Sequence, residues 1–271
     1  MALEGNHMTP EDRDDHYDAA IAVAREAGDV ALAHYRNLSA LTVESKGVQD
    51  PVSEADRQTE QVIKDRLTTM FPDDAFVGEE TGADGVDGSR GAWVVDPIDG
   101  TQPFLLGLPT WCVSIAYVAD GDIQIGVIFN PVTGDLYAAQ RGAGATLNGA
   151  RMRVSTAQRL SDGLTGMGCS NRTTAQEIGF IAEHLRAQGG MFHRCGSGAL
   201  TLAYVATGQL IGYVEMHINA WDCLAAILLV EEAGGRVSPF LQEHGVTGGG
   251  RIIAGTPDVY DEVAGLLPPQ T

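Results

Sequence analysis

The sequence predicts an α+β protein, and two patterns along its 271 residues support that fold class. In the first half, two amphipathic helix patterns precede apolar segments joined by short turns, which is typical of helices packed against a largely antiparallel sheet. In the second half, strand-like and helix-like segments alternate more regularly. The chain shows no internal repeat and no low-complexity segment. We therefore expect a single domain over residues 9–271, with subdomains of about 9–157 and 158–271.

Two helices are expected near the amino-terminal end. The first begins at Thr9-Pro10, a capping residue followed by proline at the first helical position, and its apolar residues recur at three- and four-residue steps to Tyr35. The second begins at the capping-box pattern Ser53-Glu54-Ala55-Asp56 and stops before Pro72. The segment between the helices is expected to hold a strand and then a loop, over Leu41–Val43 and Lys46–Pro51.

Apolar segments after the second helix predict strands that follow one another in a meander. Asp120-Gly121 is a good hairpin signal between two of them. A loop rich in glycine and aspartate, over Gly82–Arg90, precedes the central strand. The expected strands are Ala75–Val77, Trp93–Val95, Val113–Val118, Ile123–Phe129 and Leu136–Ala139.

Helices are expected to separate the strands of the second half, after a soft boundary near Ser155–Asp162. The expected strands are Leu164–Met167, Ile211–Met216 and Ile252–Ala254. The expected helices are Thr173–Gln188, Gly198–Thr207, Ala220–Glu232 and Pro257–Leu267.

The charge of the chain restricts its partners. Aspartate and glutamate outnumber lysine and arginine by 36 to 17, which gives a formal net charge of -19. Such a charge argues against non-specific binding to nucleic acid or to anionic membranes. It would also repel a bound phosphate unless cations mediate, so it favours a metal-dependent site. The alternative is an ordinary acidic surface.

The cysteines and the chain start suggest a cytoplasmic protein. Cys112, Cys169, Cys195 and Cys223 are scattered, without the spacing of a zinc site or of a disulfide framework. Each is expected to be a small buried residue in a reducing compartment. No signal peptide and no apolar run of membrane-spanning length is visible. Residues 1–8 are interpreted as a cloning remnant and excluded from the fold.

The segment Trp93–Thr101 organises the chain. It is typical of a buried strand that enters a tight turn and then a helix start, with Thr101 at the expected N-cap. Asp96 and Asp99 lie three residues apart at the carboxyl end of the strand, where open sheets bind ligands. Two acids on a turn can share a hard cation, and amides at a helix start can hold an anion. Taken alone, such a pair is more often a solvated turn than a metal site.

Three further acids lie at the ends of expected elements, and each has an ordinary reading. Asp56 can simply close its capping box, Asp222 can complement a helix dipole, and Glu79 can be surface. Together with Asp96 and Asp99, however, they form a set of carboxylates that could converge. Hard cations such as Mg²⁺ prefer oxygen ligands, and two bridged ions can bind a phosphate and activate a water.

The ordered set of motifs resembles the inositol monophosphatase family, the Mg²⁺-dependent, lithium-sensitive phosphatases. The matching motifs are Asp50–Asp56 after Lys46, Gly78-Glu79-Glu80, Asp96–Thr101, and Trp221-Asp222 followed by Ala225 and Glu232–Gly235. The resemblance implies a layered α-β-α-β-α sandwich of the inositol monophosphatase/fructose-1,6-bisphosphatase type. It also implies a phosphatase domain over 9–271 and a homodimer.

The resemblance further implies two to three Mg²⁺ ions per site. Glu79, Asp96 and the backbone carbonyl of Ile98 would hold the first ion. Asp96, Asp99 and Asp222 would hold the second. A third, looser ion would depend on Glu79 and water.

Other residues of the motifs would act on water and phosphate. Thr101 and Asp56 would form a hydrogen-bonded pair that, together with Glu79, orients the attacking water. The backbone N–H groups of Gly100 and Thr101 would receive the phosphate.

Two regions bear on the substrate. The resemblance implies that Glu215 accepts hydrogen bonds from substrate hydroxyls and that Gly196-Ser197-Gly198 lines the same pocket. The ordinary reading of Glu215 is a surface acid at a strand end. Many inositol-type members have Thr-Asn-Phe or Ser-Asn-Phe where this chain has Gln102-Pro103-Phe104. Proline in a first helical turn loses no intrahelical bond, so the fold should tolerate it.

We therefore expect a Mg²⁺-dependent phosphomonoesterase that hydrolyses a small polyol phosphate, myo-inositol 1-phosphate first, by metal-activated water attack. Histidinol phosphate, fructose 1,6-bisphosphate and nucleotide 3′-phosphates are the alternatives within the superfamily. A non-catalytic metal- or phosphate-binding module is the alternative of another class. No nucleic-acid or membrane partner is expected.

Overall fold

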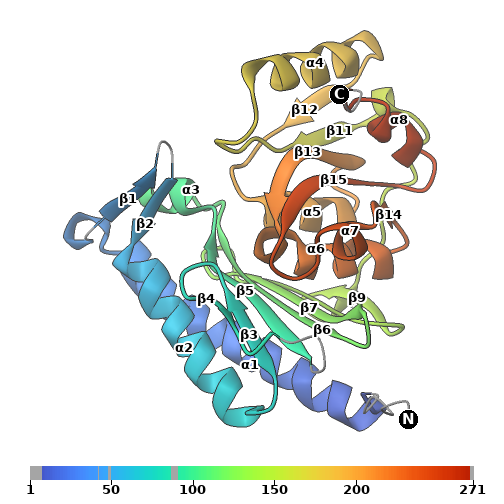
Figure 1. Cartoon of the computed structure of the whole chain (residues 1–271). Helices are drawn as coiled ribbons and strands as arrows, with labels where there is room; N and C mark the ends of the chain where they lie inside the picture. Colours follow the sequence, from blue (N-terminus) through green and yellow to red (C-terminus); the bar gives the residue numbers. More distant parts are fainter. Residues whose placement is uncertain (1–7, 42, 48–49, 87–90, 269–271) are drawn as a thin grey trace.

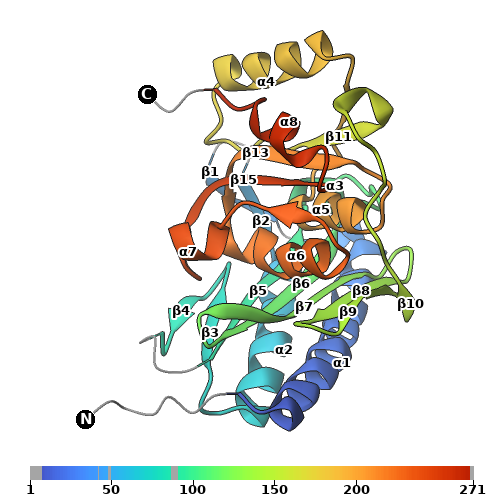
Figure 2. The same cartoon turned by 90° about the vertical axis from the view of Figure 1, so that its right-hand side faces the viewer.

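The computed structural model describes residues 8–41, 43–47, 50–86 and 91–268. Five layers follow one another through the molecule, in the order helix, sheet, helix, sheet, helix (Figures 1 and 2). The outer helices beside the first sheet are α1 (Pro10–Tyr35) and α2 (Glu54–Met70). The helices between the two sheets are α5 (Gly198–Ala206) and α6 (Ala220–Glu232). The outer helices beside the second sheet are α4 (Ala175–Ala187) and α8 (Tyr260–Ala264). The predicted α-β-α-β-α sandwich is confirmed. Within these ranges no helix is both long and apolar enough to cross a bilayer.

The first sheet has eight strands in the order β10-β9-β8-β7-β6-β5-β3-β4, and only β3 and β5 pair in parallel. The predicted hairpin is present, and Asp120 and Gly121 both have positive φ (55° and 76°), as its tight turn requires. The strands are β3 (Ala75–Gly78), β4 (Gly82–Asp84), β5 (Ala92–Asp99), β6 (Cys112–Ala119), β7 (Asp122–Asn130), β8 (Asp135–Gln140), β9 (Gly144–Leu147) and β10 (Ala150–Arg151).

The second sheet has five strands in the order β12-β11-β13-β15-β14. Its strands are β11 (Leu164–Met167), β12 (Met191–His193), β13 (Gly212–Asn219), β14 (Arg236–Val237) and β15 (Gly249–Gly255). Because β12 and β13 both run parallel to β11, the carboxyl ends of these three strands lie along one edge of the sheet. The three predicted strands are found here. Sequence analysis missed the short elements β12, β14 and α7 (Phe240–His244).

The predicted loop Lys46–Pro51 is wrong in part. Instead, β1 (Val43–Gly47) and β2 (Asp50–Ser53) pair as a separate antiparallel ribbon, which residues 48–49, outside the described range, connect. The ribbon can include Pro51 because two paired strands consist only of edges, where proline is tolerated.

Other predictions near the amino-terminal end differ in detail. The strand expected over Leu41–Val43 includes only Val43 of the described residues, because β1 begins there. Leu41 lies before the strand, and Thr42 lies outside the described residues. The expected loop Gly82–Arg90 begins with β4, and its residues 87–90 lie outside the described range, as do residues 1–7 of the segment interpreted as a remnant. Both predicted helix starts are confirmed, since Thr9 and Ser53 form complete capping boxes.

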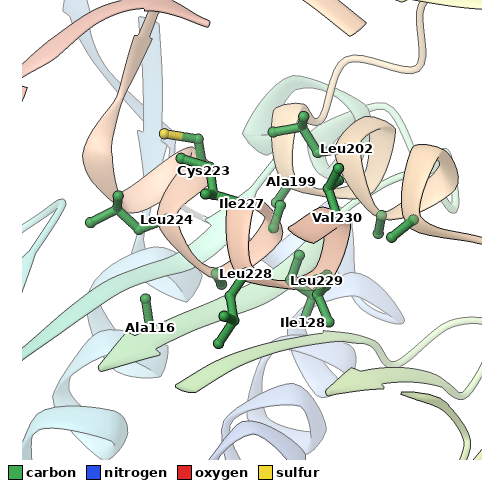
Figure 3. Packing of buried hydrophobic residues seen from close by; sticks show 14 of the residues in the cluster. Ala116, Ile128, Ala199, Leu202, Cys223, Leu224, Ile227, Leu228, Leu229 and Val230 are labelled. Atoms are coloured by element: carbon green, nitrogen blue, oxygen red, sulfur yellow. The ribbon is translucent and has the colours of Figure 1, made fainter. Parts of the chain in front are cut away.

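Helix α6 packs unusually close to the first sheet, and this contact fixes the end of the helix that carries Asp222. Its apolar residues, Leu224 and Leu228 among them, lie over the strands with Ala116 and Ile128 (Figure 3). At Gly126 of β7, a Cβ atom would lie only 2.3 Å from the backbone oxygen of Ala225. The helix backbone therefore rests directly on the strand, which only glycine permits.

We predict that Gly126→Ala lowers the free energy of unfolding by about 1–3 kcal/mol, because the added methyl group forces α6 away from the sheet. Gly179→Ala is the matched control, since Gly179 lies within α4 and its added Cβ would meet no atom within 4 Å. That control should gain about 0.5–1 kcal/mol from the better helix former. Urea denaturation measures both changes, and an undiminished stability of Gly126→Ala would contradict the close contact.

Candidate active site

Three carboxylates from distant parts of the chain meet at one point. Asp96 and Asp99 end strand β5, Asp222 lies in the first turn of α6, and oxygen atoms of the three lie within 4.8 Å of one another. Side chains at positions i and i+3 of a regular strand face opposite sides of a sheet. The pairing of β5 with β6 shifts register between Asp96 and Asp99, and such an irregularity can bring both side chains to one side.

Each of the three acids accepts hydrogen bonds from the chain. Asp96 accepts one from the backbone N–H of Ile98 at 2.9 Å. Asp222 accepts from the backbone and side-chain nitrogen atoms of Asn219 at 3.0 and 3.1 Å, within a capping box of α6. These contacts fix the orientation of both carboxylates.

Asp99 faces the amino-terminal end of α5. Its carboxylate accepts hydrogen bonds from the hydroxyl of Ser197 and from the backbone N–H groups of Gly198 (3.3 Å) and Ala199 (2.7 Å). The positive end of a helix dipole stabilises a carboxylate placed there. Ser197 and Gly198, which were expected to line the substrate pocket, thus also hold a predicted metal ligand in place.

The cluster is electrostatically unfavourable by itself. Burial, with the neighbouring charges of Glu79, Asp99 and Asp222, raises the pKa of Asp96 well above its usual value. Burial and the charge of Asp222 raise the pKa of Asp99 to about 7, and burial also raises the pKa of Asp222. In the described part of the chain no lysine or arginine pairs with these acids. An all-oxygen set of this kind fits a hard divalent cation.

Glu79 follows strand β3 and also lines the cavity, with its backbone N–H bonded to the carbonyl of Val95 at 3.2 Å. The next two residues are held by Glu60, a fully buried residue of α2 that sequence analysis missed. Its carboxylate accepts the backbone N–H groups of Glu80 and Thr81 at 2.8 and 2.7 Å. Its helical spacing from Asp56, on the otherwise apolar face of α2, was the available signal.

The predicted pair of Asp56 and Thr101 lies beside the acids. Asp56 is buried, accepts the backbone N–H and the hydroxyl of Ser53 at 2.8 and 2.6 Å, and has its pKa raised by burial. The hydroxyl of Thr101 lies 3.4 Å from Asp56 Oδ1 and 3.3 Å from the carbonyl oxygen of Ile98. Thr101 lines the cavity, whereas Asp56 reaches it only through Thr101.

The expectation that Thr101 is an N-cap is wrong. Gly100 occupies that position with φ of 97°, and Thr101 is the first residue of α3 (Thr101–Leu105). The left-handed conformation favours glycine, and a Cβ atom at Gly100 would lie 2.9 Å from the carbonyl oxygen of Thr110. As a first helical residue, Thr101 has a backbone N–H without an intrahelical partner.

The unusual Gln102-Pro103-Phe104 segment is accommodated as expected. Pro103 lies in the first turn of α3, is buried, and packs against Gly196, where a Cβ atom would lie 2.7 Å from the proline ring. Gly196 also has a positive φ of 91°. The proline thus contacts the segment that holds Asp99, and the prediction that the fold tolerates it is confirmed.

A cavity of about 670 Å³ contains these groups. Its lining includes the predicted residues Glu79, Asp96, Ile98, Asp99, Gly100, Thr101, Gly196, Ser197, Gly198, Glu215 and Asp222. Glu215 is buried on β13 and accepts a hydrogen bond from the hydroxyl of Tyr213, a residue that sequence analysis missed. Burial raises the pKa of Glu215 to about 8. It is therefore a wall of the cavity and not a surface acid.

Comparison with known proteins agrees with this geometry. The model of the inositol monophosphatase family matches residues 12–268. Nus factor SuhB of Haemophilus influenzae is 35% identical over 252 residues, which cover 92% of this chain and 94% of that protein. Inositol-1-monophosphatase of Mesorhizobium japonicum is 38% identical over 237 residues, which cover 87% and 89%. The crystal structure of extragenic suppressor protein suhB from Bartonella henselae is similar with a TM-score of 0.87 at 33% identity, covering 95% of this chain and 100% of that one.

We predict that the metal-free protein loses thermal stability as the pH rises from about 4 to about 8. The folded-state pKa values of Asp99 (about 7) and Glu215 (about 8) exceed those of an unfolded chain, so the folded state binds more protons. The stability that these two groups contribute is fully present below their pKa values in the unfolded chain. It is lost as the pH rises through their pKa values in the folded protein. Mg²⁺ should restore it at the upper end, because the ion binds deprotonated carboxylates.

The measurement is Tm against pH in EDTA and in excess Mg²⁺. Asp99→Asn is the matched variant, and its Tm in EDTA should depend less on pH. A pH dependence of Tm in EDTA that Asp99→Asn does not change would contradict the raised pKa of Asp99, and no effect of Mg²⁺ near neutral pH would contradict the cation site.

Proposed function

The chain belongs to the inositol monophosphatase family, and we propose that it is a Mg²⁺-dependent phosphomonoesterase acting on a small polyol phosphate, with myo-inositol 1-phosphate as the first candidate. The convergence of Asp96, Asp99 and Asp222 in one cavity is the observation that carries the proposal. A phosphate would be repelled by three converging carboxylates unless cations lay between them, so the acids and a phosphate substrate together call for a metal. The name inositol-1-monophosphatase of the Mesorhizobium relative supports this substrate class.

Asp96, Asp99, Asp222, Glu79 and the carbonyl of Ile98 would hold the Mg²⁺ ions, two to three in number. When bound, such ions neutralise phosphate oxygens and lower the pKa of a coordinated water. The hydrogen bonds from Ile98, Asn219 and the start of α5 keep the carboxylates oriented. These hydrogen bonds pre-organise the site, because the carboxylates lose little further side-chain motion when cation and substrate bind.

The chain itself would orient the attacking water through Thr101. Ser53 holds one oxygen of Asp56, which leaves the other for the hydroxyl of Thr101. A threonine hydroxyl that donates to Asp56 keeps its lone pairs for a water on the cavity side. The backbone N–H groups of Gly100 and Thr101 would then receive the phosphate.

Glu215 would bind the hydroxyl groups of the substrate. Tyr213 occupies one carboxylate oxygen, and the residue lines the same cavity as the acid cluster. The alternative phosphate esters, namely histidinol phosphate, fructose 1,6-bisphosphate and nucleotide 3′-phosphates, differ in the groups that they present to this wall.

Lithium sensitivity and a homodimer remain predictions. The side chains of Leu106 and Leu108 at the cavity are exposed and apolar, so a second copy of the chain could cover them.

A second candidate is a role that does not depend on catalysis. The Haemophilus relative is named Nus factor SuhB, so a protein of this family can carry a name unrelated to phosphatase activity. A metal-binding protein without activity would also need the acid cluster, but it would not need a hydroxyl placed to orient a water. The hydroxyl of Thr101, which lies beside the acids and contacts Asp56, therefore favours catalysis. Phosphate release in the presence of Mg²⁺ separates the two candidates.

We predict that Asp96→Asn lowers phosphate release from myo-inositol 1-phosphate by about 10³-fold, since a metal site contributes several kcal/mol to the transition state. Asp258→Asn, on an exposed residue, is the control and should retain wild-type activity. The assay compares a panel of the candidate phosphate esters with and without Mg²⁺. Normal turnover by a folded Asp96→Asn protein would rule out the metal-dependent mechanism.

Glu215→Gln should lower kcat/KM for myo-inositol 1-phosphate about fivefold while sparing a simple aryl phosphate, because a charged acceptor gains about 1 kcal/mol over a neutral one. The loss should be largest near pH 9, above the pKa of about 8. Equal losses on both substrates would mean that Glu215 supports the site generally.

A further inference from the structure

The second sheet and its strand ends form a wall of the cavity, beside the floor that the clustered acids make. Glu215, Arg172 and Arg194 lie on this wall. Glu215 is paired regularly with β15, but the register of β13 and β15 shifts directly after it, between Glu215 and Ile218. Such irregularities are frequent beside ligand sites. Strand pairing therefore holds the backbone of Glu215, while the direction of its side chain depends on other contacts.

Tyr213 supplies the contact that directs this side chain. Residues i and i+2 of a strand face the same side of a sheet, so Tyr213 and Glu215 point the same way. The side chain of Tyr213 is buried, and its hydroxyl donates a hydrogen bond to Glu215 Oε2. Burial and the charge of Glu215 raise the pKa of Tyr213 well above its usual value, so the phenol remains a donor. Oε1 of Glu215 is then the oxygen available to a ligand.

Two glycines of the neighbouring chain segment make room for this pair. Gly166 of β11 lies opposite Tyr213 in the parallel register, and a Cβ atom there would lie 2.8 Å from the tyrosine ring. Gly168 follows β11 and still bonds to the carbonyl of Val214 at 2.9 Å. A Cβ atom at Gly168 would lie 2.3 Å from the phenol oxygen and 2.1 Å from Glu215 Oε2. The backbone of this segment thus encloses both partners, and a side chain at either glycine would displace them.

A simpler reading is that the bond only satisfies a buried acid. An apolar residue would serve better in a purely structural wall, because burial of a carboxylate is costly. Burial raises the pKa of Glu215 to about 8, and the hydrogen bond from Tyr213 lowers it. Nearby charges act in both directions, since those of Asp222 and Asp99 raise this pKa and that of Arg194 lowers it. The acid is therefore better explained by a ligand that it binds, and the tyrosine by the need to hold that acid in place.

We propose that Tyr213 is a positioning residue for substrate recognition: its hydroxyl holds Glu215 so that Oε1 meets the hydroxyl groups of the substrate, and it thereby sets the preference for polyol phosphates over esters without such groups. The inference rests on the proposed phosphatase function and concerns only the choice of substrate. Tyr213 acts through Glu215 and takes no part in the chemistry of the phosphate.

Tyr213→Phe tests the proposal, because it removes the hydroxyl and keeps the ring that packs on the glycines. The measured quantity is the ratio of kcat/KM for myo-inositol 1-phosphate to kcat/KM for a simple aryl phosphate, at saturating Mg²⁺. The variant should lower this ratio about threefold, with the value for the aryl phosphate close to that of the wild type. Since the lost hydrogen bond lowers the pKa of Glu215, the pH at which the ratio is half-maximal should move upward.

Two further variants separate this role from a structural one. Tyr117→Phe is the matched control, since Tyr117 is also buried and its hydroxyl donates to Asp74 Oδ1 at 2.9 Å, in the first sheet. Tyr117 is not among the described residues that line the cavity, so this variant should lower Tm and preserve the ratio. In a Glu215→Ala background, which removes the carboxylate, Tyr213→Phe should change the ratio no further.

Several results overturn the inference and leave the phosphatase function standing. These are an unchanged ratio in a folded Tyr213→Phe protein, equal losses on both esters, and a further loss of the ratio in the Glu215→Ala background. Hydrolysis of the aryl phosphate without hydrolysis of any polyol phosphate has the same meaning. No Mg²⁺-dependent phosphate release from any ester removes both the inference and the proposed function.

Discussion

The rest of the structure depends on the convergence of Asp96, Asp99 and Asp222 at one point, where the first two are buried. Three like charges held this close repel one another strongly, and no basic side chain within the described ranges pairs with them. The fold opposes this repulsion with oriented dipoles. The start of α5 faces Asp99, and the hydroxyl of Ser114 on β6 holds the backbone at Trp221 beside Asp222. These contacts hold the three carboxylates in place, and a bound cation would neutralise their remaining repulsion.

The packing of the middle layer makes this arrangement possible. Two of the acids belong to the first sheet and the third to α6, so their separation is set by how closely that helix lies on the strands. Gly126 and the apolar contacts of Leu224 and Leu228 determine this distance (Figure 3). The core therefore does more than stabilise the fold, because it sets the geometry of the candidate site.

Elements with strong local signals could be predicted from the sequence, whereas those defined by distant partners could not. The capping boxes at Thr9 and Ser53 and the turn at Asp120-Gly121 are local, and they gave α1, α2 and the β6–β7 hairpin. The short strand β12 carries little pattern of its own and forms only because β11 lies beside it. The N-cap was misplaced by one residue because Gly100 adopts a left-handed conformation and lies too close to Thr110 and Ser197 for a side chain, and both contacts are tertiary.

The same distinction applies to the site. The motif acids were identified because they lie at element ends, whereas the contacts of Glu60 and Tyr213 join residues through tertiary packing that no short motif records. Gly166 and Gly168 were not identified for the same reason, since only the parallel register of β11 and β13 places them against Tyr213.

The floor and the wall of the cavity belong to different parts of the chain, and this division has an evolutionary consequence. The acids come from the first sheet and α6, whereas Arg172, Arg194 and Glu215 come from the second sheet and the segments at its strand ends. Substitutions at these three positions would change which molecules enter, whereas neighbouring residues of the same segments, Asn219 and Ser197, hold the acids and would have to stay. The product of a duplicated gene could therefore acquire a new substrate through a few changes at the cavity wall. The substrates of such proteins can then change faster than the reaction that the acids support.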